Sequence, residues 1–116
     1  MNDRELLELA AKAAGIVVDR WLPDGSPQLV RTTHQLGPIW SPFTDDGDAL
    51  RLAVKLKLDV WRSMWPSKER YVAAHKVWNP NDSMYYDDGV AIGEDPYAAT
   101  RRAIVRAAAE IGKAMK

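Results

Sequence analysis

Cysteine is absent from this sequence of 116 residues, long apolar runs are lacking, and neither sign of charge is in excess. Without cysteine the chain has no disulfide, no thiolate metal site and no cysteine nucleophile. Basic and acidic residues number 16 each, which argues against attraction of nucleic acid by the charge of the whole protein. No run approaches the roughly 18 apolar residues of a membrane span, and the first residues show no signal-peptide pattern. We therefore expect a soluble, cytoplasmic protein without a membrane partner.

The residues that are present are ordinary for a folded domain. Hydrophobic residues make up 47% of the chain and charged residues 28%, which excludes disordered and collagen-like chains. A length of 116 residues has room for one domain. We expect a single domain over residues 1–116.

Three segments have the spacing and end signals of amphipathic helices. Asn2 is placed to cap the first helix, and Gly15 is placed to end it. The last helix is expected to start at Asp95 as cap, with Pro96 at its first position, and to run to about Lys113. The middle helix starts at residue 44 or 45. Its predicted apolar face consists of Ala49, Leu50, Ala53, Val54 and Leu56.

Runs rich in β-branched and aromatic residues predict the strands. Residues 16–22 and 28–33 flank a proline- and glycine-containing turn, which predicts a hairpin. Residues 34–48 hold two prolines and two glycines and are expected to form an irregular loop. Further strands are predicted at 58–64, 70–78, 83–87 and 90–92. The order is α-β-β-α-β-β-(β)-α, which favours the α+β class: a single α-β-α sandwich in which three helices cover one mainly antiparallel sheet of about four or five strands.

Three blocks of the chain resemble small uncharacterised proteins of tailed phages and prophages. They are NDRELLELAAKAAG at 2–15, WSPFTDDGDALRLAVKL at 40–56 and DPYAATRRAIVRAAAE at 95–110. The chain is similar in these blocks to the phage ABA-sandwich domain family, whose name describes an α-β-α layered fold. It departs from the family pattern at Ser41, where Asn usually stands, and at Lys57, where Gly often ends the helix. The resemblance implies a place inside an infected or lysogenic bacterium, and it implies no activity, cofactor or site residue.

Patterns of catalytic or metal-binding residues are weak in this sequence. Asp45, Asp46 and Asp48 suggest an oxygen site for a divalent cation, but capping and the helix dipole also explain them. His34 and His75 are far apart and lack a local partner, which favours structural roles over a metal or general-base role. No nucleophile elbow or phosphate-binding loop occurs. We expect a protein without catalytic activity, cofactor or metal.

Five tryptophans are many for a chain of this length. Three of them fall in predicted strands and are assigned to the core. The other two fall in loops beside prolines, and tryptophan is enriched at interface hot spots. The candidate protein-binding residues are Trp40, Phe43, Met64 and Trp65.

The charge is placed unevenly along the chain. Residues 96–116 carry five basic residues and one acidic residue. Arg101, Arg102 and Arg106 near the start of the last helix are therefore a candidate nucleic-acid-binding face, as in some double-stranded-RNA-binding domains. Pairing of these arginines with the acidic loops is the alternative explanation.

The family resemblance, together with the absence of catalytic motifs, implies a small, non-enzymatic phage or prophage accessory protein that acts by binding a host or phage protein. Self-association is a further option, and nucleic-acid binding by the arginines is the alternative function.

Overall fold

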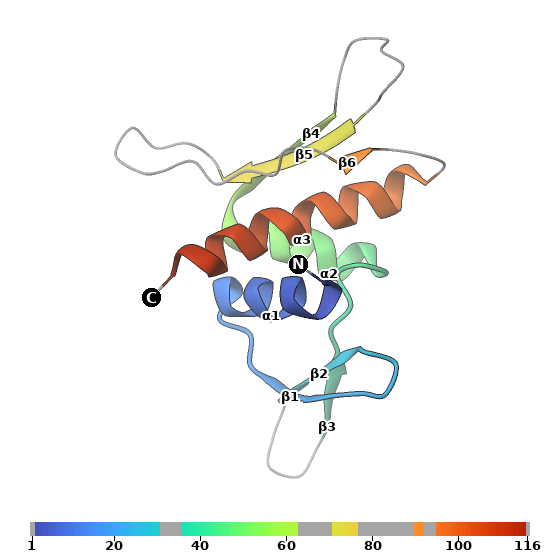
Figure 1. Ribbon diagram of the computed structural model, residues 1–116, viewed down its shortest axis with the longest axis vertical. Helices are drawn as coiled ribbons and strands as arrows, with labels where there is room; N and C mark the ends of the chain where they lie inside the picture. Colours follow the sequence, from blue (N-terminus) through green and yellow to red (C-terminus); the bar gives the residue numbers. More distant parts are fainter. Residues whose placement is uncertain (1, 31–35, 63–70, 77–89, 92–94, 116) are drawn as a thin grey trace.

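The computed structural model describes residues 2–30, 36–62, 71–76, 90–91 and 95–115 (Figure 1). The order of its elements agrees with the α+β class predicted from the sequence. In these ranges the elements are α1 (Asp3–Ala14), β1 (Val18–Trp21), β2 (Pro27–Val30), β3 (Leu36–Ile39), α2 (Asp46–Leu56), β4 (Leu58–Arg62), β5 (Tyr71–Lys76), β6 (Val90–Ala91) and α3 (Pro96–Ala114).

Local signals place the helix ends where the sequence predicts them. The Asn2 side chain caps α1 by accepting a hydrogen bond from the Glu5 N–H at 2.8 Å. Gly15 ends this helix with a φ of 68°, a left-handed conformation that glycine adopts without strain. The Asp95 carboxylate accepts from the Tyr97 and Ala98 N–H groups, both at 3.0 Å, and so caps α3.

The core lies mainly between α1 and α3, which run side by side in the same direction (Figure 1). Small residues on both helices bring their backbones close together. The backbones of the two helices approach each other closely at Gly112, where an added Cβ atom would lie 2.0 Å from the carbonyl oxygen of Leu9. The fully buried or nearly buried alanines in this contact are Ala10, Ala11, Ala14, Ala103, Ala107 and Ala108.

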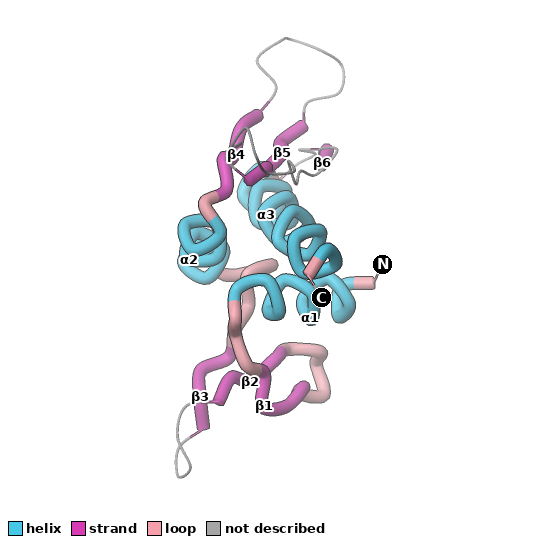
Figure 2. Tube along the Cα trace, turned by 90° about the vertical axis from the view of Figure 1, so that its left-hand side faces the viewer, coloured by secondary structure: helices cyan, strands magenta, loops and turns pink. Residues whose placement is uncertain are grey.

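The described strands form two antiparallel sheets of three strands each, with orders β1-β2-β3 and β4-β5-β6. The sheets lie on opposite sides of the helices (Figures 1 and 2). The antiparallel pairing and the class agree with the prediction, but the layers differ from the expected single sheet between helices. Along the chain α2 stands between the two sets of strands, and in space the helices lie between the two sheets (Figure 2).

Strand β3 lies inside the segment that the sequence analysis expected to be irregular. It pairs with β2 through Gln28 with Ile39 and Val30 with Leu36, with a register irregularity between them. A strand that includes Pro38 is possible here because β3 is at the edge of its sheet, where a missing N–H costs no ladder bond. The strand predicted at 83–87 falls outside the described residues.

Candidate functional site

The predicted protein-binding residues do not share one environment. Trp40 is only 4% exposed and belongs to the core. Its backbone N–H donates to the carbonyl oxygen of Pro27 at 3.0 Å. This burial corrects the expectation that Trp40 offers surface to a partner. Phe43 is half-buried against the core, and Met64 and Trp65 lie outside the described residues.

Two of the three candidate nucleic-acid-binding arginines are engaged inside the molecule. Arg101 Nε donates to the carbonyl oxygen of Phe43 at 2.7 Å, and its Nη1 lies 2.6 Å from Asp46 Oδ1. Arg102 Nη2 lies 2.8 Å from Asp3 Oδ1, and its guanidinium stacks 5.2 Å from the centre of the Phe43 ring. The third, Arg106, is half-buried. The arginines therefore tie α3 to α1 and to the segment before α2, as the pairing alternative predicts.

The acidic residues at the start of α2 have structural roles. Asp45 Oδ2 accepts from the Asp48 N–H at 2.8 Å and caps the helix. Asp48 accepts from the Ser41 N–H at 2.9 Å and from Arg51 Nη2 at 2.7 Å. The hydrogen bond to Asp48 raises the pKa of the Arg51 guanidinium. Among the described residues, histidines and carboxylates nowhere gather in a group of three that suits a metal ion.

The structure describes the backbone of one of the two histidines. His34 lies outside the described residues. His75 is a residue of β5 and pairs through its backbone with Asp59 of β4.

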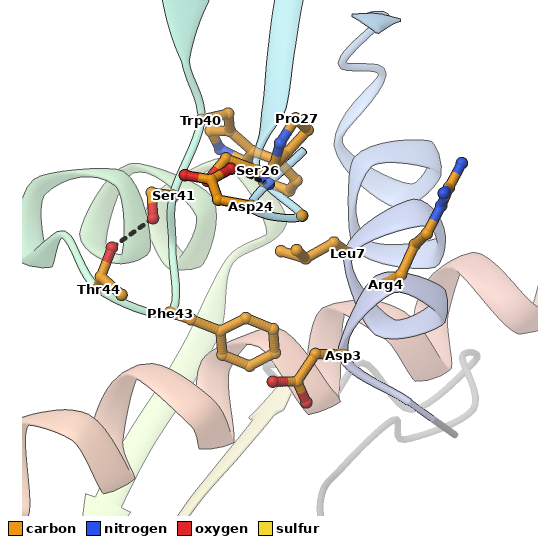
Figure 3. A pocket seen from close by; sticks show the side chains of 11 residues that line it. Asp3, Arg4, Leu7, Asp24, Ser26, Pro27, Trp40, Ser41, Phe43 and Thr44 are labelled. Atoms are coloured by element: carbon orange, nitrogen blue, oxygen red, sulfur yellow. Dashed lines mark hydrogen bonds between the residues drawn. The ribbon is translucent and has the colours of Figure 1, made fainter. Parts of the chain in front are cut away.

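A cleft that the sequence analysis missed opens between the start of α1, the β1–β2 turn and the segment before α2 (Figure 3). Its volume is about 240 Å³. Leu7, Pro27, Trp40 and Phe43 form its apolar floor, and polar groups stand at its rim. The rim residues are Asp3, Arg4, Asp24, Gly25, Ser26, Ser41 and Thr44. Residues from three separate segments build this cleft, so no local motif marks it.

A second feature is an exposed apolar stripe on α2. Leu50 is 62% exposed and Val54 is 69% exposed, whereas the sequence pattern assigned both to the buried face. The structure buries Ala49, Leu52 and Ala53 instead. Six of the eleven residues of α2 are apolar, and one packed face of a helix this short cannot cover all of them.

Strand β4 follows α2 directly in the chain and lies next to it (Figure 2). There Val60 is 41% exposed. Two exposed lysines accompany these apolar residues and have no ion pair among the described groups. We call this set the α2–β4 surface: Leu50, Val54, Lys55, Lys57 and Val60.

None of the helices in the described ranges combines the length and the apolar character that crossing a bilayer requires. Comparisons with protein-family models, with curated proteins and with solved structures gave no match to this chain.

Proposed function

We propose that this chain is a non-enzymatic protein-binding module and that the α2–β4 surface is its contact face. The main observation in support of this proposal is that Leu50 and Val54 are both exposed, one helical turn apart on the same side of α2. Scattered exposed apolar residues are normal on a protein surface. Two exposed apolar residues one helical turn apart, with the exposed Val60 on the strand that follows the helix, are typical of the apolar centre of an interface.

The charge beside the stripe indicates the kind of partner. Lys55 and Lys57 flank the apolar residues and are exposed, while the nearby Arg51 is already paired with Asp48. An interface commonly has an apolar centre and a polar rim, and complementary charge at the rim guides the encounter. The surface therefore suits a protein partner whose own apolar patch is edged by carboxylates.

We also propose a phage or prophage origin, and here the support is the resemblance of blocks 2–15, 40–56 and 95–110 to the phage ABA-sandwich family. A gene that lies among phage genes in a bacterial chromosome supports this origin. A gene that stands alone among housekeeping genes argues against it.

Affinity capture with matched variants tests the contact face. Wild-type protein, Val54→Asp and Val17→Asp are each used to capture partners from bacterial lysate, with and without nuclease treatment. Val17 is as exposed as Val54, at 67% against 69%, but it lies between α1 and β1. We expect a stoichiometric partner that Val54→Asp loses and Val17→Asp retains, with unchanged circular dichroism for both.

Two outcomes contradict the proposal. A partner that Val54→Asp still captures shows that another face makes the contact. Captured material that is lost on nuclease treatment favours nucleic-acid binding. The structure gives that function less support, because Arg101 and Arg102 already form ion pairs within the protein. Sedimentation of the purified protein separates a second copy of the chain from a different partner.

A further inference from the structure

The cleft beside α1 combines an apolar floor with an aromatic ring. Leu7 is 7% exposed, and Pro27 is among the most completely buried side chains described. The Phe43 ring stands in the cleft beside Leu7 (Figure 3). Such a floor favours the apolar stem of a ligand, and the Phe43 ring adds apolar area to it while Arg102 stacks 5.2 Å from its centre.

The three charged residues at the rim, Asp3, Arg4 and Asp24, differ in whether they have an ion-pair partner. Asp3 is paired with Arg102. Arg4 pairs with Glu8 at 3.2 Å and stacks 4.7 Å from the centre of the Trp21 ring, so its side chain extends away from the floor (Figure 3).

Asp24 differs from these two residues, because it forms no ion pair with any group that the structure describes. Its Oδ1 accepts a hydrogen bond from the Ser26 N–H at 2.9 Å. That hydrogen bond lowers the pKa of Asp24 below its usual value of 3.8, so the carboxylate is ionised at neutral pH. The cleft thus presents one negative charge without a cationic partner beside an apolar floor.

The size of the cleft limits the ligand. Sites for drug-sized molecules run from about 300 to 1,000 Å³, and this cleft measures about 240 Å³. One short chain with one charged end fits within such a volume. Hydroxyl groups of Ser26, Ser41 and Thr44 add hydrogen-bond acceptors at the rim.

From this combination we propose that the cleft binds an organic cation, a primary ammonium or guanidinium group on a short apolar stem, with Asp24 as its counter-ion and Leu7 and Phe43 under the stem. The cation is either a free amine or the lysine or arginine side chain of a peptide, and the chemistry recognised is the same. This site is separate from the α2–β4 surface and does not depend on the function proposed for that surface.

Titration of the ¹⁵N-labelled full chain tests this site by NMR. The probes are n-butylammonium, N-acetyl-lysine methylamide and the neutral isostere n-butanol. We expect saturable shifts of the backbone amides of Leu7, Gly25 and Ser26 with both cations and none of comparable affinity with the alcohol. Tighter binding of n-butylammonium identifies a free amine as the ligand, and tighter binding of the capped lysine identifies a peptide side chain.

A pair of variants links the binding to one carboxylate. Asp24→Asn keeps the oxygen that accepts from Ser26 and therefore keeps the turn, but it removes the charge. We expect it to weaken both cations by about tenfold or more, while Asp19→Asn on β1 leaves the affinity unchanged. Equal binding of n-butanol, unchanged affinity in Asp24→Asn, or no saturable shift overturns the proposal, whatever partner the lysate capture gives.

Discussion

At the scale of single residues, the close approach of α1 and α3 depends on Gly112. The space that a Cβ atom would need there is occupied by backbone of Leu9, which cannot rotate away as a side chain does. Gly47 offers a contrast, because an added Cβ would meet only the flexible end of Arg51 and the Asp45 carboxylate, at 3.2 to 3.3 Å.

We predict that Gly112→Ala lowers the free energy of unfolding by up to about 2 kcal/mol. The helices must move apart, and this overpacking costs about 1–3 kcal/mol, of which the higher helix propensity of alanine recovers about 1 kcal/mol. Urea denaturation measures the difference. Gly47→Ala is the control and should keep or slightly raise the wild-type stability, and equal midpoints for the two variants would contradict the packing argument.

Lys57 holds the left-handed conformation that ends α2, with a φ of 58°. A residue with a Cβ atom adopts this region only with strain, and glycine does not. We predict that Lys57→Gly stabilises the protein by about 0.5–1 kcal/mol, after the greater freedom of glycine in the unfolded chain is subtracted. Lys55→Gly, inside the same helix, should destabilise by about 1 kcal/mol. Thermal unfolding of both variants shows whether the signs differ as expected.

At the scale of elements, Arg101 joins α3 to the segment that leads into α2. Its side chain is 15% exposed and bonds both the Phe43 carbonyl and the Asp46 carboxylate. We predict that Arg101→Ala costs about 1.5–3 kcal/mol, the range for hydrogen bonds with a charged partner. Arg51→Ala, which removes a solvent-exposed ion pair, should leave the urea midpoint close to wild type. Similar losses of unfolding free energy for both variants would mean that Arg101 does not stabilise the contact between α3 and the segment before α2.

The element ends were predictable from the sequence because their causes are local. Asn2, Gly15 and Asp95 act within a few residues of their own positions, so the pattern alone locates them. The division into two sheets and the pairing of β3 depend on contacts between distant segments, and a local pattern carries no information about those contacts. The sequence pattern also failed to predict the exposure of Leu50 and Val54. Helix periodicity shows which residues share a face, but the elements packed against the helix determine how many of those residues are buried.

The candidate sites illustrate the same limit. Loop position and neighbouring prolines suggested that Trp40 is accessible, but pairing of its backbone with Pro27 turns the indole into the core. For the arginines of α3, the sequence left two roles open: binding of nucleic acid, or ion pairs with acidic residues of the same chain. That choice depends on where Asp3 and Asp46 lie in space.

At the scale of the whole molecule, the helices and the β1-β2-β3 sheet contribute differently to the core. The helices supply most of the buried hydrophobic residues, whereas the β1-β2-β3 sheet adds the buried Pro27 and half-buried contacts from Val18, Trp21 and Leu29. Regions with less buried apolar surface open at a lower free energy.

We predict that native-state hydrogen exchange resolves two stabilities. Amides of α1 and α3 facing each other should exchange only with global unfolding, and the amides that close the β1–β2 turn should exchange through a smaller opening. The amide of Leu22, bonded to the Ser26 carbonyl at 2.8 Å, is one reporter. Identical opening free energies for both groups would show that the sheet and the helices unfold as one unit.

The pairing of α1 with α3 also governs when the protein can fold during its synthesis. The residues that join these helices at their two ends, Asp3 with Arg102 and Lys12 with Met115, are 99 and 103 positions apart. The nascent chain therefore carries the apolar face of α1 without its partner until α3 leaves the ribosome, exposed to chaperones and to other nascent chains. Contacts this distant in sequence also slow folding relative to a helical protein with local pairings. The core that α1 begins is therefore completed only when α3 has been synthesised.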